Sequence, residues 1–322
     1  MGKGPAIEER LSNWRPLRRV ILFSRKIVLP GFDGIPLYDV MVFFFRGLFR
    51  GFLTSRAASI SFNFFLAIFP TLVFFFTIIP YIPIANFQES LMELLLGFLP
   101  HTADATVEEI IRDIVTQPHA GWFSVSFVLT LYFSTSGIYG LMDAFNSTYH
   151  AIESRSWFTL RLISLALILV ISAMLILSIG LITFGTSLVN LILPDRILNS
   201  GFYYFVLISG KWAVILSLLF FAISLLYYYA PARRSRFRFI SAGSTLATLL
   251  VILTTFGFNF YVDNFSRYNV LYGSIGTLMI VLLWIYFNAI SLLIGFELNA
   301  SIQNAKLNQS GINDPAISGR KE

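Results

Sequence analysis

Six long apolar stretches constrain what this chain can fold into, because each is about as long as a helix that crosses a membrane. Such a helix needs roughly 20 mostly apolar residues to cross about 30 Å of hydrocarbon. None of the stretches alternates polar and apolar residues as the strands of a membrane barrel do. The pattern therefore predicts an all-α, polytopic membrane helix bundle of about six transmembrane helices. The stretches are Ala57–Pro80, Gly121–Met142, Thr159–Val189, Tyr203–Tyr229, Phe239–Val262 and Gly273–Phe296.

The composition agrees with a membrane protein and removes some kinds of chemistry. The chain is 56% hydrophobic and only 12% charged, whereas soluble domains carry about 25% charged residues. It contains no cysteine, which excludes disulfides, thiolate metal sites and cysteine nucleophiles.

The distribution of lysine and arginine predicts the orientation. Of the 23 lysines and arginines, 19 lie before the first stretch, in the second and fourth loops, or in the tail, when Arg161 at the start of the third stretch is counted with the second loop. Three lie in the first, third and fifth loops. Cytoplasmic loops carry the excess of positive charge. We therefore expect a multi-pass protein of the cell (inner) membrane, with its N- and C-termini in the cytoplasm.

The regions around the stretches divide the chain into three parts. Residues 1–37 are predicted to form a basic cytoplasmic arm, residues 38–302 the transmembrane domain, and residues 303–322 a disordered cytoplasmic tail. Within the transmembrane domain, residues 38–54 resemble a basic amphipathic helix at the membrane interface, and residues 81–120 an external loop with amphipathic helices.

The motifs of common enzymes are absent from the sequence. It contains no H-E-x-x-H, no Gly-x-Ser-x-Gly and no phosphate-binding Gly-Lys-Ser/Thr loop. His101 and His119 with the acidic residues between them fit a solvated face better than a metal site. Basic residues gathered at membrane edges explain the net charge better than nucleic-acid binding does. We expect no catalytic residues, no cofactor, no metal and no nucleic-acid partner.

Polar residues within or beside the stretches are the candidate site residues, because ionisable groups inside a membrane are costly. We predict that Arg56 and Glu297 meet near the cytoplasmic ends of the first and sixth helices. Lys211 either belongs to a cavity or extends its amine to the outer interface, and the asparagines either bind substrate or join helices. The cavity candidates are Arg56, Asn63, Lys211, Asn288 and Glu297, and the lipid headgroup candidates are Arg46, Arg50, Arg233 and Arg234.

Several segments, taken in order, resemble one known family. They are ASISFNFFLAIFPTL (58–72), the stretch from Ser136 to Tyr149, LYYYAPARRSRFRF (226–239), YGSIG (272–276) and GFELNA (295–300). Together they resemble the YihY/BrkB family of bacterial inner-membrane proteins, once labelled ribonuclease BN. Ala232 and Phe237 depart from the family's pattern. The resemblance implies six helices with cytoplasmic ends and implies little about activity.

Three hypotheses for the function remain at this point. The first is a transporter or lipid-moving, flippase-like protein of the bacterial envelope, with a small molecule or lipid as substrate. The second is a scaffold that transports nothing and uses its faces of small residues and its basic helix to bind partners, anionic lipid or a second copy of itself. The third and weakest is a membrane-embedded hydrolase or ribonuclease. A deep polar cavity favours the first, and a solid apolar bundle favours the second.

Overall fold

The computed structural model describes residues 22–50, 52–78, 120–148, 153–192, 201–232, 239–265 and 267–309, and contains no strand in those ranges. The predicted all-α fold is therefore confirmed. The external loop predicted at 81–120 lies almost entirely outside the described residues. The helices are α3 (Leu37–Arg50), α4 (Leu53–Ile78), α7 (Ala120–Thr148), α8 (Trp157–Ile192), α10 (Gly201–Tyr229), α11 (Ala242–Phe265) and α12 (Arg267–Gln309).

The number of membrane-crossing helices agrees with the sequence. Five of the described helices are long and apolar enough to cross a membrane, and the count is six if α3 and α4 form one broken span. α3 and α4 meet at a bend of 63°. Phe52, at the bend, has a φ of +48°, a backbone conformation that a right-handed helix does not contain. The predicted interfacial helix thus ends at Arg50 rather than at residue 54.

The last helix is longer than the sixth apolar stretch. α12 has 43 residues, about 65 Å at 1.5 Å per residue, and reaches Gln309 rather than ending near residue 302. Its C-terminal part is helical because it has an apolar face to cover. Ile302 and Ala305 are buried against Phe32 and Val40, and the Lys306 ammonium lies 3.0 Å from the Asp33 carboxylate.

The main core joins α7, α10 and α12 through three aromatic rings. Phe145 stacks on Phe296 with ring centroids 4.1 Å apart, and Tyr227 meets both rings edge-on. The Tyr227 hydroxyl donates a 2.6 Å hydrogen bond to the carbonyl of Leu292, which satisfies the polar end of an otherwise buried ring.

Two glycines set the distance between α11 and α12. A methyl group at Gly243 would collide with the carbonyl of Gly295 and with Asn299, and one at Gly295 would collide with the carbonyl of Gly243. The amide of Gly243 also donates to Asn299 Oδ1 at 2.8 Å. Small residues allow helices to approach closely in lipid, so Gly243 and Gly295 serve the packing of α11 on α12.

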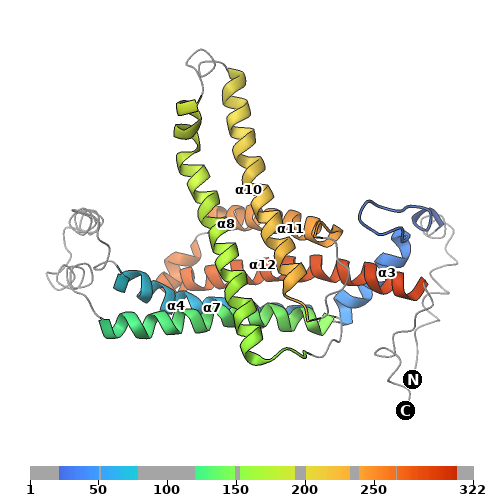
Figure 1. The fold of residues 1–322 in the computed structure, drawn as a ribbon, viewed down its shortest axis with the longest axis horizontal. Helices are drawn as coiled ribbons and strands as arrows, with labels where there is room; N and C mark the ends of the chain where they lie inside the picture. Colours follow the sequence, from blue (N-terminus) through green and yellow to red (C-terminus); the bar gives the residue numbers. More distant parts are fainter. Residues whose placement is uncertain are drawn as a thin grey trace.

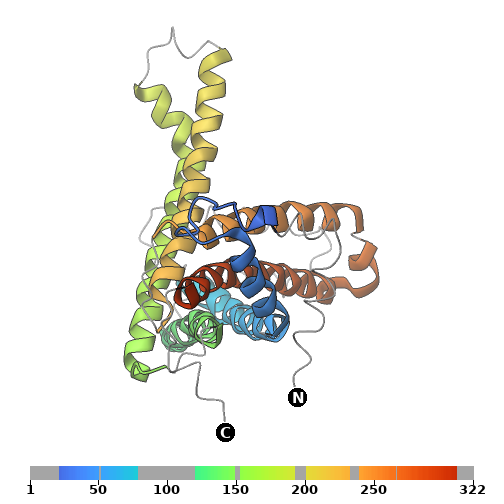
Figure 2. The same cartoon turned by 90° about the vertical axis from the view of Figure 1, so that its right-hand side faces the viewer.

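α8 and α10 form a pair that projects away from the other helices (Figures 1 and 2). α8 crosses α7 instead of running alongside it, so the start of α8 lies against the middle of α7. The outer parts of the pair expose large apolar side chains, among them Leu169, Ile176 and Trp212. Apolar side chains exposed in this way suit contact with lipid.

Candidate functional site

The structure brings Arg56 and Glu297 together. Arg56, in the first turn of α4, reaches across to the end of α7. Its Nη1 donates to the carbonyl of Ala144 at 2.8 Å and to Thr148 Oγ1 at 2.7 Å. Its Nη2 lies 3.9 Å from Glu297 Oε2 on α12, and both side chains are nearly buried. The site therefore joins the start of α4 and the end of α7 to α12, twelve residues before α12 ends at Gln309.

The charged groups of Arg56 and Glu297 are far apart for an ion pair that is nearly buried. A separation of 3.9 Å is beyond hydrogen-bond distance. Arg56 Nε and Nη2 are buried and have no hydrogen-bond partner among the described residues. Buried charges are tolerated when they are paired and their remaining donors are satisfied. Arg56 meets this condition only in part.

α3 covers the carboxylate of this pair. Gly47 packs so closely on Glu297 that a methyl group at residue 47 would overlap the carboxylate oxygen. The glycine is therefore what allows the amphipathic helix to lie over the buried pair. Neither Gly47 nor Thr148 is among the sequence's candidates, because only the packing of α3 and α7 on α12 reveals them.

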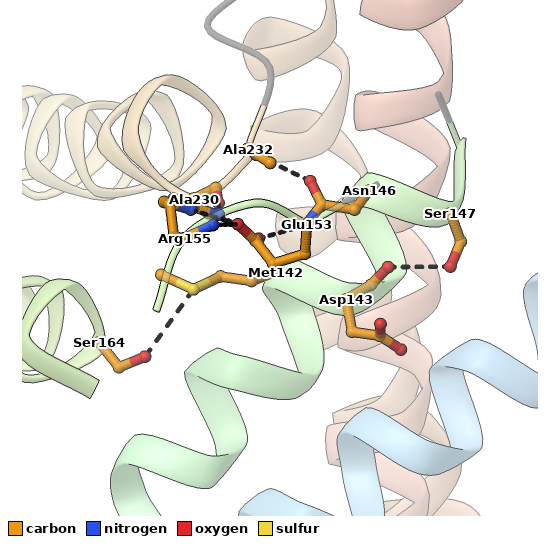
Figure 3. A network of polar contacts seen from close by, with 9 residues as sticks. All are labelled: Met142, Asp143, Asn146, Ser147, Glu153, Arg155, Ser164, Ala230 and Ala232. Carbon is orange, nitrogen blue, oxygen red and sulfur yellow. Dashed lines mark hydrogen bonds and ion pairs between the residues drawn. The ribbon is translucent and has the colours of Figure 1, made fainter. Parts of the chain in front are cut away.

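A second charged pair, Arg155 and Glu153, shows what a fully satisfied one looks like in this protein (Figure 3). Arg155 Nε and Nη2 donate to the two Glu153 oxygens at 2.8 and 2.7 Å. Arg155 Nη2 also donates to the carbonyl of Ala230. The hydrogen bonds from Arg155 hold the pKa of the Glu153 carboxyl below its usual value, because they favour the charged carboxylate.

Asn146 extends this pair into a network between two loops. Its Nδ2 donates to Glu153 Oε2, and its Oδ1 accepts from the amide of Ala232, both at 2.8 Å. The network fixes the segment after α10 to the segment before α8. The second and fourth loops therefore lie at the same end of the bundle, as the charge distribution predicts.

The remaining cavity candidates do not join Arg56 and Glu297. Asn63 donates to the carbonyl of Ser59 and packs on Gly140, and Asn288 donates to the carbonyl of Trp284. Each amide thus bonds to its own helix. Lys211 lies twelve residues before Ile223, where α10 enters the core, a distance of about 18 Å along a helix.

The lipid headgroup candidates are only partly described. Arg46 is exposed on α3, and its guanidinium lies 5.8 Å from the ring centre of Phe43. The side chain of Arg50 and the whole of Arg233 and Arg234 lie outside the described residues.

The described residues hold no group of three or more histidines, aspartates or glutamates that could bind a metal. His101, His119 and His150 all lie outside them. A shallow pocket of about 310 Å³ opens between α11 and α12, with Asn259 and Trp284 in its wall. None of the predicted site residues lines it.

Comparison with known proteins decides the family. The model of a family described as virulence factor BrkB matches residues 44–317. The chain belongs to the BrkB family. The match includes all of α4 to α12 and both residues of the buried pair, so the resemblance read from the sequence is confirmed. No solved structure matches the chain.

Three relatives each match more than two thirds of this chain. A ribonuclease-like protein of Bacillus subtilis, YfkH, is 27% identical over 78% of this chain and 90% of its own length. A UPF0761 membrane protein of Xanthomonas campestris is 26% identical over 80% of this chain, but the match covers 60% of that protein. A UPF0761 membrane protein of Idiomarina loihiensis is 28% identical over 69% of this chain and 75% of its own length.

Proposed function

We propose that this BrkB-family protein moves an anionic amphiphile, such as a phospholipid, within the membrane, and that Arg56 is the cation that receives it. The observation that carries the proposal is the incomplete pairing of Arg56. Two of its nitrogens are buried without a hydrogen-bond partner among the described residues, and its counter-charge stands 3.9 Å away.

The mechanism that follows is an exchange of partners. Arginine binds phosphate and carboxylate oxygens with paired N–H groups. An incoming anionic headgroup that accepts hydrogen bonds from Arg56 Nε and Nη2 would replace the weak contact between Arg56 and Glu297. The Glu297 carboxylate would then repel the bound headgroup and favour its release. A strongly bonded pair such as Arg155 and Glu153 would resist that exchange.

A second candidate function, a scaffold that transports nothing, is favoured by the way the bundle is filled. The aromatic cluster of Phe145, Tyr227 and Phe296 packs the centre, and the pocket of about 310 Å³ lies away from the charged pair. The scaffold would bind lipid or partner proteins on its surface, and a second copy of the chain is one such partner.

We also propose that the protein is not an enzyme and binds no nucleic acid. The name of YfkH describes that protein as ribonuclease-like. In this chain two of the arginine and lysine side chains at the described ends of the bundle are held in ion pairs, Arg155 with Glu153 and Lys306 with Asp33. Such pairs are poor acid–base catalysts, because each charge stabilises its partner's ionised form.

The proposed orientation places both termini in the cytoplasm of the inner membrane. Single cysteines at Asn199 and Asn264 should react with a membrane-impermeant maleimide on intact spheroplasts, whereas those at Ser154 and Ser235 should react only after lysis. The chain has no cysteine of its own, so each signal reports one site. Labelling at Ser235 in intact spheroplasts would contradict the orientation, because that loop carries the arginine cluster.

The transport proposal predicts lipid movement in vesicles that contain only this protein. Proteoliposomes are made with fluorescent phosphatidylglycerol, and a membrane-impermeant reductant is added outside. If the protein moves the lipid to the outer leaflet, the reductant should also bleach the label that started in the inner leaflet. Arg56→Gln should lower the initial rate by about tenfold, the effect of losing about 1.4 kcal/mol of interaction. Gly47→Ala should also change the rate, because it displaces the Glu297 carboxylate without altering any charge.

Lys306→Gln is the matched control for this assay. It removes a cation from an exposed pair on the same helix as Glu297 and should leave the rate unchanged. If the wild-type protein bleaches no faster than empty vesicles, with phosphatidylglycerol or with phosphatidylcholine, the transport proposal fails and the scaffold remains. An equal loss of rate in Lys306→Gln would show a general effect of charge.

A further inference from the structure

Arg161 occupies the place where α8 crosses α7. Its Nη1 donates to Thr135 Oγ1 at 2.8 Å and to Ser136 Oγ at 2.9 Å. A longer bond of 3.3 Å runs to the carbonyl of Tyr132. Arg161 belongs to one candidate membrane span, Trp157–Ser178, and its partners belong to another, Ser124–Thr148. The guanidinium therefore lies between two apolar helices.

The charge of Arg161 has no counter-charge in the part of the chain that the structure describes. Glu297, Glu153 and Asp33 pair instead with Arg56, Arg155 and Lys306, and Asp39 accepts a hydrogen bond from Gln309. Arg161 Nε is buried and has no hydrogen-bond partner among the described residues. Cations in membrane spans usually pair with a carboxylate or mark a functional pathway, and the neutral hydroxyls of Thr135 and Ser136 bring no negative charge.

Aromatic rings surround this cation and are themselves exposed. The guanidinium carbon lies 4.8 Å from the ring centre of Tyr132, 5.4 Å from that of Trp157 and 5.8 Å from that of Tyr139. Between 40% and 57% of the surface of these three residues is exposed. Cation–π contact lowers the cost of keeping the charge out of water, and tyrosine and tryptophan favour the headgroup level of a membrane.

We propose that Arg161, together with Tyr132, Tyr139 and Trp157, binds the phosphate of an anionic lipid headgroup. The phosphate supplies the missing negative charge and accepts hydrogen bonds from the Arg161 guanidinium. The three aromatic rings contact the glycerol and the upper part of the acyl chain. This site is separate from Arg56 and needs no transport, so it stands or falls independently of the proposed function.

The test uses the fluorescence of Trp157, which contacts the proposed ligand. In a variant that keeps Trp157 and replaces the four other tryptophans by phenylalanine, lipids brominated on the acyl chain quench the indole on contact. In phosphatidylcholine vesicles, brominated phosphatidylglycerol should quench the Trp157 fluorescence at a concentration about tenfold lower than brominated phosphatidylcholine does. That difference corresponds to an affinity about tenfold higher for the anionic lipid. Arg161→Gln should remove the preference.

The matched control keeps only Trp212, which is 54% exposed on α10 and should be quenched equally by both lipids. If Arg161→Gln does not fold, Arg161→Lys serves in its place and should weaken the preference, because an ammonium lacks the flat, paired donors of a guanidinium. Equal quenching at Trp157, or a preference that survives Arg161→Gln, would overturn the proposal. A fluorescence change with inorganic phosphate at equal strength would identify free phosphate, and not lipid, as the ligand.

Discussion

Replacing Gly295 by leucine should abolish the folded protein. A methyl group at this position would already collide with the carbonyl of Gly243, with Ala247 and with the Tyr227 hydroxyl. Two of these neighbours belong to α11 and one to α10, and a backbone carbonyl cannot turn aside as a flexible side chain can. Overpacking that forces helices apart costs more than about 3 kcal/mol, which is a large part of the stability of a typical domain.

The measurement is the yield of monodisperse protein after extraction in detergent, together with its midpoint of thermal unfolding. Gly257→Leu on α11 is the matched control, because a methyl group there would meet no atom within 4 Å. Its yield should equal that of the wild type. If Gly295→Leu unfolds at the same temperature as Gly257→Leu, the helices do not approach at Gly243 and Gly295 as described.

Removing either charge of the buried pair should cost about 3 kcal/mol of the free energy of unfolding, because it leaves the other charge buried without a counter-charge. Glu297→Gln strands Arg56, and Arg56→Gln strands Glu297. The double variant should lose less than the sum of the two, since it strands neither. The free energies of unfolding of the three variants and the wild type, measured in the same detergent, give the coupling directly.

The pair of Lys306 and Asp33 is the control for this cycle. Its ammonium and carboxylate are only 3.0 Å apart, but the lysine side chain is 54% exposed, so its coupling should stay below about 1 kcal/mol. Additive and negligible effects at Arg56 and Glu297 would show that water reaches the pair. The argument for an anion-receiving arginine would then lose its basis.

The meeting of Arg56 and Glu297 shows how far a sequence can lead to a site. Arg56 begins one apolar stretch and Glu297 ends another, and alternating spans place those two ends at the same depth. Depth follows from counting residues along each helix, at 1.5 Å per residue. Lys211 and Asn288 were candidates only because they are polar groups within apolar stretches, and that criterion does not say which side of a helix faces which neighbour.

The residues that the sequence reasoning missed all depend on how helices cross. Gly47 matters because α3 bends back over Glu297, and Asn146 because the loop after α10 reaches it. Arg161 was counted only as a positive charge near a membrane edge, whereas the crossing of α8 over α7 places it against Thr135 and Ser136. A pattern within one segment carries no information about these angles.

The sequence by itself determined that the chain is an all-α membrane protein of about six apolar helices. The favourable free energy of transferring apolar residues into lipid adds up along each continuous segment. It also determined the family, through short segments in a fixed order. Only the tertiary structure decided which polar groups meet, which arginines remain without full partners, and that α12 continues to Gln309. Those outcomes depend on contacts between residues far apart in the chain, and the packing of whole helices fixes such contacts.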